Sequence, residues 1–531
     1  MKHEMWGRVC VALLSSLAAV LAGCSSPSSR EDSSPHIFGY AVDRPLLTTN
    51  VGSSLGRSTN AHELAGRLYP GIYVTGPEGQ TIPNSDLMDA RLLPGAQQRV
   101  QIQISDKAVY SDGAPITCDS FLLAFTAATQ RPIFDSAMPL YQQVDSVECV
   151  PGGKLAIVVF KDNFGERWRH LFNAGTLLPA HAIAAKLDMP LDVFSNVLKS
   201  RDPAAMEPIA QIWNTGFNLD QFDPELQISS GPLKIESIGS SGEVTLVRNE
   251  RYFGEKSALE RLIVWPSGSD IQTLAGRGDI QIAEVASTSQ ASWVNRNDPN
   301  NPFTIIYKPG VLSEQLVLGS GGIFADPENR RAFAACIDQP RLAHISKEFS
   351  GVDTPATTVR TVRPQDPVHL KMRDITDPHR ATDIPAATRI SGQTVRIGYF
   401  GPDKRKAAMV QAIADSCQDA GVSIVDVSRE APSLGNLSEV LGNEFGVYYS
   451  QEGGADANLL SVDPMLEFPI RATSTSNIGA TREAEQRSWD LVPSIPIAVE
   501  PRIYIIDKKI ANVVENTDLY GLSWNIDRWQ E

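Results

Sequence analysis

The stretch from Ser229 to Trp265 constrains the fold of this chain more than any other part of its sequence. Two short segments with alternating apolar residues, around Leu233 and around Val244, are separated by residues rich in glycine and serine. Such a pattern predicts a β-hairpin. A third apolar segment, Leu262 to Trp265, follows shortly afterwards. The stretch therefore predicts a hairpin and a third strand.

A second stretch of the sequence predicts a helix between two strands. Residues Val395 to Phe400 and Ser423 to Val427 are short apolar segments, and Lys404 to Ala420 between them has apolar residues at helical spacing and ends at Gly421. A strand, a helix and a strand in this order predict two parallel strands joined by a crossover helix. The chain is therefore expected to belong to the α/β class.

Composition limits the number of domains and the kinds of partner. The 531 residues, 42% of them hydrophobic, exceed what one core usually spans, so two or more domains are expected. A net charge of −15 argues against a nucleic-acid partner. No phosphate-binding loop, dinucleotide fingerprint or His-Glu-x-x-His motif occurs, so we expect neither a cofactor nor a metal.

The N-terminus has the pattern of an export signal. Lys2 and Arg8 precede an apolar run that ends in Leu-Ala-Gly-Cys24, which resembles the bacterial lipobox. The resemblance implies a signal peptide over residues 1–23, acylation of Cys24 by chains such as palmitate, and a tether over residues 24–35. Several acyl chains anchor a protein stably. We therefore expect a lipoprotein on the outer face of the cell membrane.

Several motifs resemble one protein family. They are Gly-Pro-Leu-Lys at 231–234, Arg-Asn-x-x-Tyr-Phe-Gly at 248–254, Lys-x-Val-Tyr-Ser-Asp-Gly-x-Pro-Ile-Thr at 107–117, Gly-Asp-Ile-Gln-Ile-Ala at 278–283 and the Asp-Pro helix start at 326. In these motifs the chain resembles the extracytoplasmic solute-binding proteins of peptide and nickel ABC importers, solute-binding family 5.

The resemblance implies a two-lobed periplasmic-binding-protein-like α/β fold, type II and cluster C, with mixed sheets and a hinge. Lobe I is expected over residues 36–266 and 495–531, with the extra subdomain of the peptide binders, and lobe II over 267–494. The implied function is a monomeric, non-enzymatic receptor that binds a peptide or another small solute between the lobes. Its implied partners are ABC permease subunits with a separate ATPase, and it touches the membrane only through its lipid.

Four cysteines remain after Cys10 in the signal peptide and the acylated Cys24 are set aside: Cys118, Cys149, Cys336 and Cys417. Four cysteines allow three disulfide connectivities. Given the lobes that the resemblance implies, only the pairs Cys118–Cys149 and Cys336–Cys417 leave the lobes free to open, so we favour this pairing. The alternative is four buried thiols.

The resemblance also suggests ligand-binding residues. Relatives meet the ammonium group of a peptide with an aspartate that follows a lobe II strand, and Asp456 is our candidate, with Glu452 as a competitor. Tyr448, Tyr449 and Trp213 are further candidates for the cleft. No residue stands out as the base for a ligand carboxylate. Residues 350–394 lack periodicity, depart from the family pattern and are expected to form a long surface excursion.

Two alternatives to transport stay open. One is a ligandless scaffold or regulator of the cell envelope built on the same fold. The other is a lipoprotein esterase, because Gly52 to Gly56 fits the Gly-x-Ser-x-Gly pattern around Ser54. No Asp and His pair downstream completes a triad in an obvious way.

Overall fold

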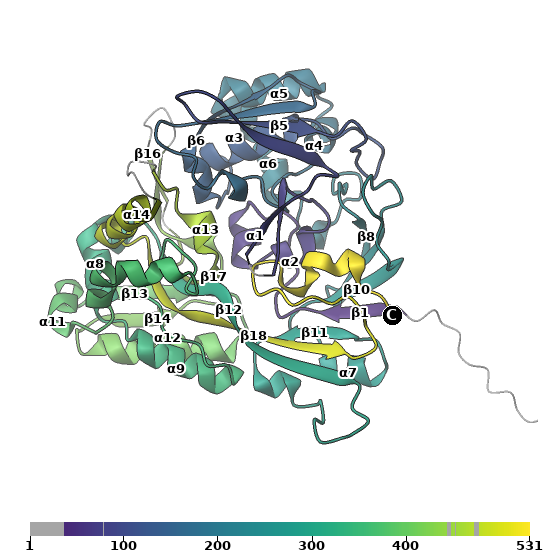
Figure 1. The fold of residues 1–531 in the computed structure, drawn as a ribbon. Helices are drawn as coiled ribbons and strands as arrows, with labels where there is room; N and C mark the ends of the chain where they lie inside the picture. The colour runs from purple at the N-terminus through teal and green to yellow at the C-terminus, as the bar shows by residue number, and fades with distance from the viewer. Residues whose placement is uncertain (1–36, 78, 443–447, 452, 472–476) are drawn as a thin grey trace, which may run out of the picture. The chain divides into compact units, whose positions relative to one another are not determined.

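A computed structural model describes residues 37–77, 79–442, 448–451, 453–471 and 477–531 (Figure 1). Its strands form one large sheet, one four-stranded sheet and two small two-stranded sheets. The order in the large sheet is β14 (Ser423–Asp426), β13 (Thr394–Gly398), β17 (Ala457–Val462), β12 (Phe303–Leu318), β18 (Ser494–Asp507), β11 (Ile282–Val285), β1 (Phe38–Ala41), β10 (Arg261–Trp265), β9 (Val244–Arg248) and β8 (Leu233–Ile238).

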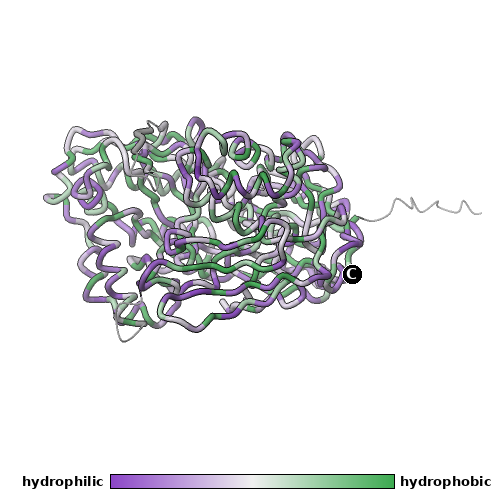
Figure 2. The backbone as a smooth tube through the Cα atoms, turned by 90° about the horizontal axis from the view of Figure 1, so that it is seen from above, coloured by the Kyte–Doolittle hydropathy of each residue, from purple (hydrophilic) through white to green (hydrophobic). Residues whose placement is uncertain are grey.

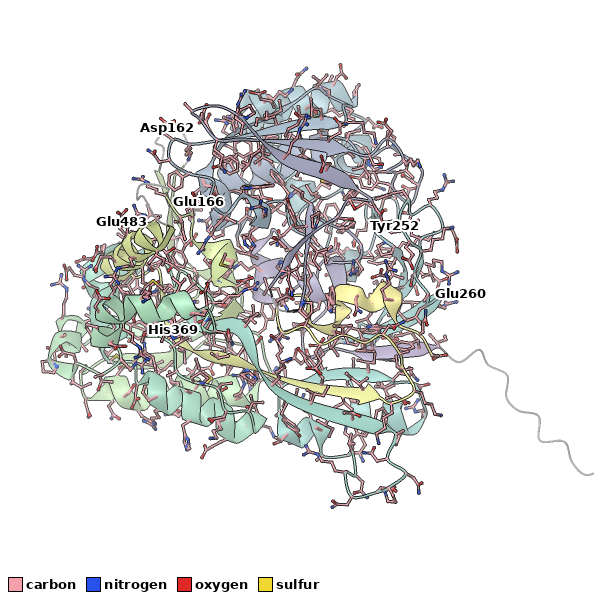
Figure 3. The ribbon with its side chains drawn as sticks, in the orientation of Figure 1. Asp162, Glu166, Tyr252, Glu260, His369 and Glu483 are labelled. Atoms are coloured by element: carbon pink, nitrogen blue, oxygen red, sulfur yellow. A yellow bond between two sulfur atoms is a disulfide. The ribbon has the colours of Figure 1, made fainter. Side chains whose placement is uncertain are left out.

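The expected hairpin and third strand are confirmed. Strand β9 pairs antiparallel with both β8 and β10, and β10 runs parallel to β1. Leu233 and Val244 are buried, as their alternation predicts. Gly242 in the turn has a φ of 83°, a conformation that favours glycine. Tyr252 and Glu260, in the loop between β9 and β10, lie at the edge of the molecule in Figure 3.

The predicted strand, helix and strand unit is also confirmed. Strands β13 and β14 run parallel, and α12 (Lys404–Gln418) connects them. Helix α9 (Gln339–Ser350) packs against α12 and β18. Helix α8 (Pro327–Ala335) begins as its Asp-Pro motif predicts, because the Asp326 side chain accepts a hydrogen bond from the N–H of Glu328.

The two long strands β12 and β18 lie in the middle of the large sheet, between β17 on one side and β11 on the other. Residues 503–506 of β18 pair with β11, whereas residues 313–318 of β12 pair with β17. The β12–β18 ladder is interrupted between Pro309 and Ser313. Strand β11, which the sequence analysis assigned to lobe II, also pairs with β1. The boundary at residue 266 stays a prediction, and these pairings favour a later crossing within β12.

A separate layer lies at the top of Figure 1. Strands β4 (Met88–Leu93), β5 (Arg99–Ile104), β7 (Leu155–Phe160) and β6 (Val144–Cys149) form an antiparallel sheet in this order. Helix α3 (Asp119–Thr129) packs against β6, α4 (Ala180–Lys186) and α5 (Leu191–Ser200). Thr117 lies two residues before α3, and its hydroxyl donates to the Asp119 carboxylate in the first turn of this helix.

The expectation of a surface excursion over residues 350–394 is wrong for its first part. Residues 357–362 are buried, and Arg360 and Thr361 are fully so. The Glu485 carboxylate accepts hydrogen bonds from the N–H groups of both residues, and the Trp489 ring lies 3.7 Å from the Arg360 guanidinium. Contacts with α14 (Asn477–Leu491) thus cover a segment that lacks any periodic pattern. His369, labelled in Figure 3, lies in the later part of residues 350–394, which is more exposed than residues 357–362.

Hydrophobic residues lie mainly inside the fold and hydrophilic residues mainly at its edge (Figure 2).

Disulfide bonds join Cys118 to Cys149 and Cys336 to Cys417, the pairing that the sequence analysis favoured. Within the described ranges, no helix combines the length and apolar character needed to cross a membrane.

Candidate ligand-binding site

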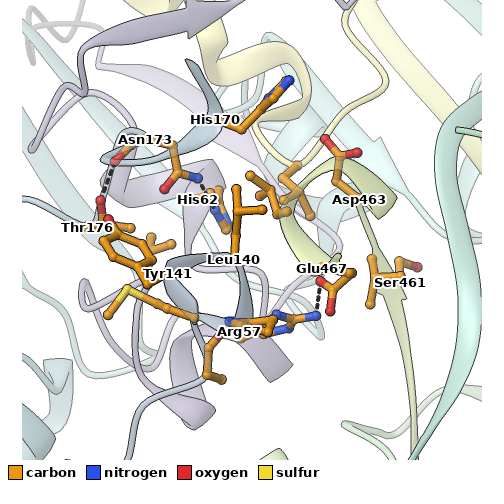
Figure 4. Close-up of a pocket in the computed structure, with 17 residues that line it drawn as sticks. Arg57, His62, Leu140, Tyr141, His170, Asn173, Thr176, Ser461, Asp463 and Glu467 are labelled. Carbon is orange, nitrogen blue, oxygen red and sulfur yellow. Dashed lines mark hydrogen bonds and ion pairs between the residues drawn. The ribbon is translucent and has the colours of Figure 1, made fainter. Parts of the chain in front are cut away.

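A small cavity lies between two walls that are far apart in the sequence (Figure 4). The first wall comes from α1 (Ser54–Ser58), η1 (Pro139–Gln143) and residues up to Thr176. The second wall comes from the end of β17 and from α13 (Pro464–Glu467). The cavity measures about 50 Å³, which is room for a few water molecules.

An ion pair joins the two walls. The Arg57 guanidinium of α1 binds the Glu467 carboxylate of α13, and each side chain is only 14% exposed. Burial raises the pKa of Glu467, although Arg57 acts in the opposite direction. A second arginine, Arg167, lies outside the lining and donates to the carbonyl oxygens of Pro464 (2.8 Å) and Phe468 (3.0 Å). These contacts hold α13 against the first wall.

Asp463 follows β17 and is the N-cap residue of α13. Its carboxylate accepts from the N–H of Met465 and forms a two-pronged ion pair with Arg363, with N–O distances of 3.1 and 2.6 Å. Burial opposes the negative charge, but Arg363 outweighs it and holds the pKa of Asp463 below its usual value. Asp463 is therefore an ionised carboxylate that already has a cationic partner.

Two histidines on the first wall are neutral. Burial lowers the pKa of His62 to about 3 and that of His170 to about 4. His62 lies 3.4 Å from the amide nitrogen of Asn173 and packs edge-on against Tyr520. Neither imidazole adds charge to the cavity at neutral pH.

A larger cavity of about 430 Å³ lies beside the loop after β1 and the start of α12. This volume is in the range of pockets that hold small molecules. Its charged lining residues are Asp43, Arg44, Asp403, Lys404, Arg405 and Lys406, and Phe349 and Phe400 add apolar surface. Lys406 is only 5% exposed.

Of the predicted ligand residues, Asp456 and Trp213 line neither cavity, and the side chains of Tyr448 and Tyr449 are not described. Asp456 precedes β17 and is buried in an ion pair with Arg396, at 2.8 Å. Trp213 of α6 (Pro203–Thr215) is buried against Phe134. Tyr448 and Tyr449 belong to β16 (Tyr448–Gln451), whose side chains are not described. Their roles in ligand binding stay predictions, and Cys24 and Glu452 lie outside the described residues.

Asp463 and Lys406 are not among the residues predicted from the sequence, although each has a local signal. An Asp-Pro pair after a mainly apolar segment marks Asp463-Pro464, in the same way as an Asp-Pro pair marks the helix start at Asp326-Pro327. For Lys406 the signal is a run of three bases in the first turn of a helix, where the helix dipole disfavours cations.

Ser54 lies at the start of α1 and is buried. The neighbouring Ser53 caps the helix, since its Oγ accepts from the N–H of Gly56 at 2.9 Å. The Gly-x-Ser-x-Gly match thus coincides with the capped start of a helix.

Comparisons with known proteins identify similar chains. The family described as "Bacterial extracellular solute-binding proteins, family 5 Middle" matches residues 97–461. The uncharacterized lipoprotein Rv2585c of Mycobacterium tuberculosis is 31% identical over 549 residues, which cover 96% of this chain and 95% of the relative.

Solved structures share the fold. The periplasmic EDTA-binding protein EppA has a TM-score of 0.62 at 20% identity, covering 93% of this chain and 96% of its own. The oligopeptide-binding protein AppA of Bacillus subtilis, in complex with a nonapeptide, has a TM-score of 0.64 at 14% identity, covering 93% and 99%. The chain thus has the mixed α/β, two-lobed fold of periplasmic binding proteins.

Proposed function

The chain belongs to the bacterial extracellular solute-binding proteins of family 5, and we propose that it is the solute receptor of an ABC importer. In this proposal a monomer captures short peptides or similar polar solutes between its lobes and presents them to permease subunits that work with a separate ATPase. The nonapeptide complex of AppA supports peptides as one class of solute. The family is one of binding proteins, so we expect no catalysis.

The proposal places the chain on the outer face of the cell membrane, held by acyl chains on Cys24. Two observations support this placement. The sequence Leu-Ala-Gly-Cys follows an apolar run at the N-terminus. In addition, the M. tuberculosis relative, which is similar over nearly its whole length, is named a lipoprotein.

The observation that carries the proposed function is the polar contact between the two walls of the smaller cavity. Arg57 and Arg167 bind groups on α13, more than 290 residues later in the chain. Such contacts exist only when the lobes are close together, so a solute that bridges the walls shifts the population toward the closed form. Capture is thereby coupled to a shape that a permease can recognise.

Isothermal titration calorimetry of the protein against dipeptide, oligopeptide and nickel pools tests this function. We expect saturable binding of at least one pool, together with a smaller radius of gyration in small-angle X-ray scattering. In the matched control, the solutes that bind are first removed from the pool, and titration with this depleted pool must give no heat. Absence of binding to all three pools, with an unchanged radius of gyration, contradicts the proposal.

One observation favours the ligandless alternative, an envelope scaffold or regulator on the same fold. The smaller cavity has a volume of only about 50 Å³, and protein side chains already satisfy its charged groups. A scaffold of this kind keeps the same radius of gyration with every solute pool. The calorimetric experiment therefore separates the two functions.

A further inference from the structure

The smaller cavity has apolar side chains on both of its walls (Figure 4). The first wall contributes Val51, Ala137, Met138 and Leu140, and the second wall contributes Val462 and Leu466. Leu466 of α13 packs against the same hydrophobic core as Met138 of the first wall. An apolar group that enters the cavity therefore contacts apolar surface from both walls.

The charged side chains of the lining are neutralised in pairs. Arg57 binds Glu467, and Asp463 binds Arg363, which itself lies outside the lining. A charged solute group in the cavity thus has to displace one member of a pair or remain without a counter-charge. Burial of an unpaired charge is costly.

The other titratable groups at the cavity add no charge to it. His62 and His170 are neutral, because burial lowers their pKa values to about 3 and about 4. The buried Nδ1 of His62 has no hydrogen-bond partner among the described residues, so it offers a dipole rather than a charge. Asp518 lines a neighbouring hollow of about 10 Å³, which has room for no more than one water molecule. The described lining therefore favours a neutral, apolar group.

The volume of the cavity limits the size of the group that fits. About 50 Å³ is room for a few water molecules, which corresponds to about three or four carbon atoms. The side chain of valine has this size, whereas an aromatic ring is larger. Burial of each additional carbon that fits should tighten binding about fourfold.

We propose, resting on the proposed receptor function, that the smaller cavity is a selectivity pocket for one branched aliphatic side chain of a peptide solute. Apolar surface on both walls stabilises such a side chain. A lysine or glutamate side chain is excluded, since the pocket has no free counter-charge for it. The pocket narrows the broad class of short peptides to those that carry a residue of about the size of valine.

Calorimetry with five homotripeptides tests the proposal: triglycine, trialanine, trivaline, trilysine and triglutamate. Each probe repeats one side chain, so the result does not depend on which position of the peptide reaches the pocket. We expect trivaline to bind about 15-fold more tightly than trialanine, and trialanine about fourfold more tightly than triglycine. Trilysine and triglutamate should bind at least about 100-fold more weakly than trivaline.

Two variants change the size of the pocket in opposite directions. Ala137→Leu fills it, so the preference for trivaline over trialanine should fall below about twofold. Leu466→Ala enlarges it, so trileucine should gain at least about fivefold relative to trivaline. Each readout is a ratio between two solutes on one protein, so a loss of stability in a variant affects both solutes alike. The matched control is Leu370→Ala, which removes a side chain that is 49% exposed and should leave every ratio unchanged.

Binding of trilysine or triglutamate within about threefold of trivaline overturns the proposal, and so does a trivaline preference that is unchanged in both variants. Either result leaves the receptor function intact, because the probes still bind. Failure of all five tripeptides while a solute pool binds also overturns the proposal alone. Failure of every tripeptide and every pool rejects both the pocket and the receptor function.

Discussion

At the residue scale, Asp518 shows how this fold shifts the ionisation of a single group. Its Oδ1 accepts from the N–H of Tyr520 at 2.8 Å, whereas Oδ2 is buried with no hydrogen-bond partner among the described residues. Burial raises the pKa of Asp518 to about 7, even though Arg363 and Arg502 act in the opposite direction. The folded protein therefore favours the protonated carboxyl group over a pH range in which the unfolded chain ionises.

This shift predicts a pH-dependent stability. The unfolded carboxyl group ionises near pH 4, so the contribution of Asp518 to the free energy of unfolding should fall as pH rises from about 4 to about 7 and then level off. Asp518→Asn should remove this dependence and be more stable than the wild type by roughly 2–4 kcal/mol at pH 8, with little difference at pH 4. Urea denaturation at both pH values measures it.

The matched control for this experiment is Asp220→Asn, which changes an exposed carboxyl group. We expect its stability to follow the wild type at both pH values. If Asp518→Asn and the wild type differ by the same amount at pH 4 and pH 8, Asp518 does not titrate in this window.

At the element scale, each disulfide bond holds a helix to a neighbouring element. Cys336, at the C-terminal end of α8, is joined to Cys417 near the end of α12, across a sequence separation of 81 residues. Cys118, directly before α3, is joined to Cys149 at the end of β6, across 31 residues. Neither bond includes a residue that lines the two cavities.

The longer loop should make the Cys336–Cys417 bond the more stabilising one, because it restricts the unfolded chain more. Loop-closure entropy predicts losses of about 4–5 kcal/mol for Cys336→Ala with Cys417→Ala and about 3–4 kcal/mol for Cys118→Ala with Cys149→Ala. Guanidinium denaturation of the two double variants measures these losses.

Each double variant is the control for the other, and both should keep the solute affinity of the wild type, since the bonds lie away from the cavities. A larger loss for the shorter loop would contradict the entropic explanation. A tenfold loss of affinity in either variant would show that its bond helps to shape the site.

At the scale of the whole molecule, contacts across the smaller cavity tie together segments that the sequence separates widely. Arg57 and Glu467 are 410 residues apart, and Arg167 and Phe468 are 301 residues apart. The two long strands β12 and β18 form the connection behind them. Loss of these side-chain contacts should therefore open the cleft without unfolding either part of the sheet.

Arg57→Met should shift the protein toward an open form, because it leaves Glu467 buried without its cation when the lobes close. Breaking a buried ion pair is costly, so we expect solute affinity to fall roughly tenfold to a hundredfold. Small-angle X-ray scattering should show a larger radius of gyration in the presence of solute.

Arg341→Met is the control, because Arg341 and Asp415 form an exposed pair on α9 and α12, with each side chain 45% exposed. Exposed pairs contribute little, so this variant should change the stability by less than about 1 kcal/mol and leave the affinity unchanged. An Arg57→Met protein with the radius of gyration and affinity of the wild type would show that the pair does not control closure.

The sequence by itself determined those parts of the fold that depend on neighbouring residues. The hairpin over 233–248, the α/β unit over 394–426 and the Asp-Pro start of α8 follow from apolar periodicity and capping, which act over a few residues. The resemblance of its motifs also identified the family, since these motifs form local turns and helix starts.

Only the tertiary structure decided which charges meet. It buries Arg360 beneath α14 in a segment without periodicity, and it brings Asp463 rather than Asp456 to the cavity. It also leaves the ammonium of Lys406 without an ion-pair partner among the described residues. The physical reason is that an ion pair depends on positions set by contacts hundreds of residues apart, which no local pattern records.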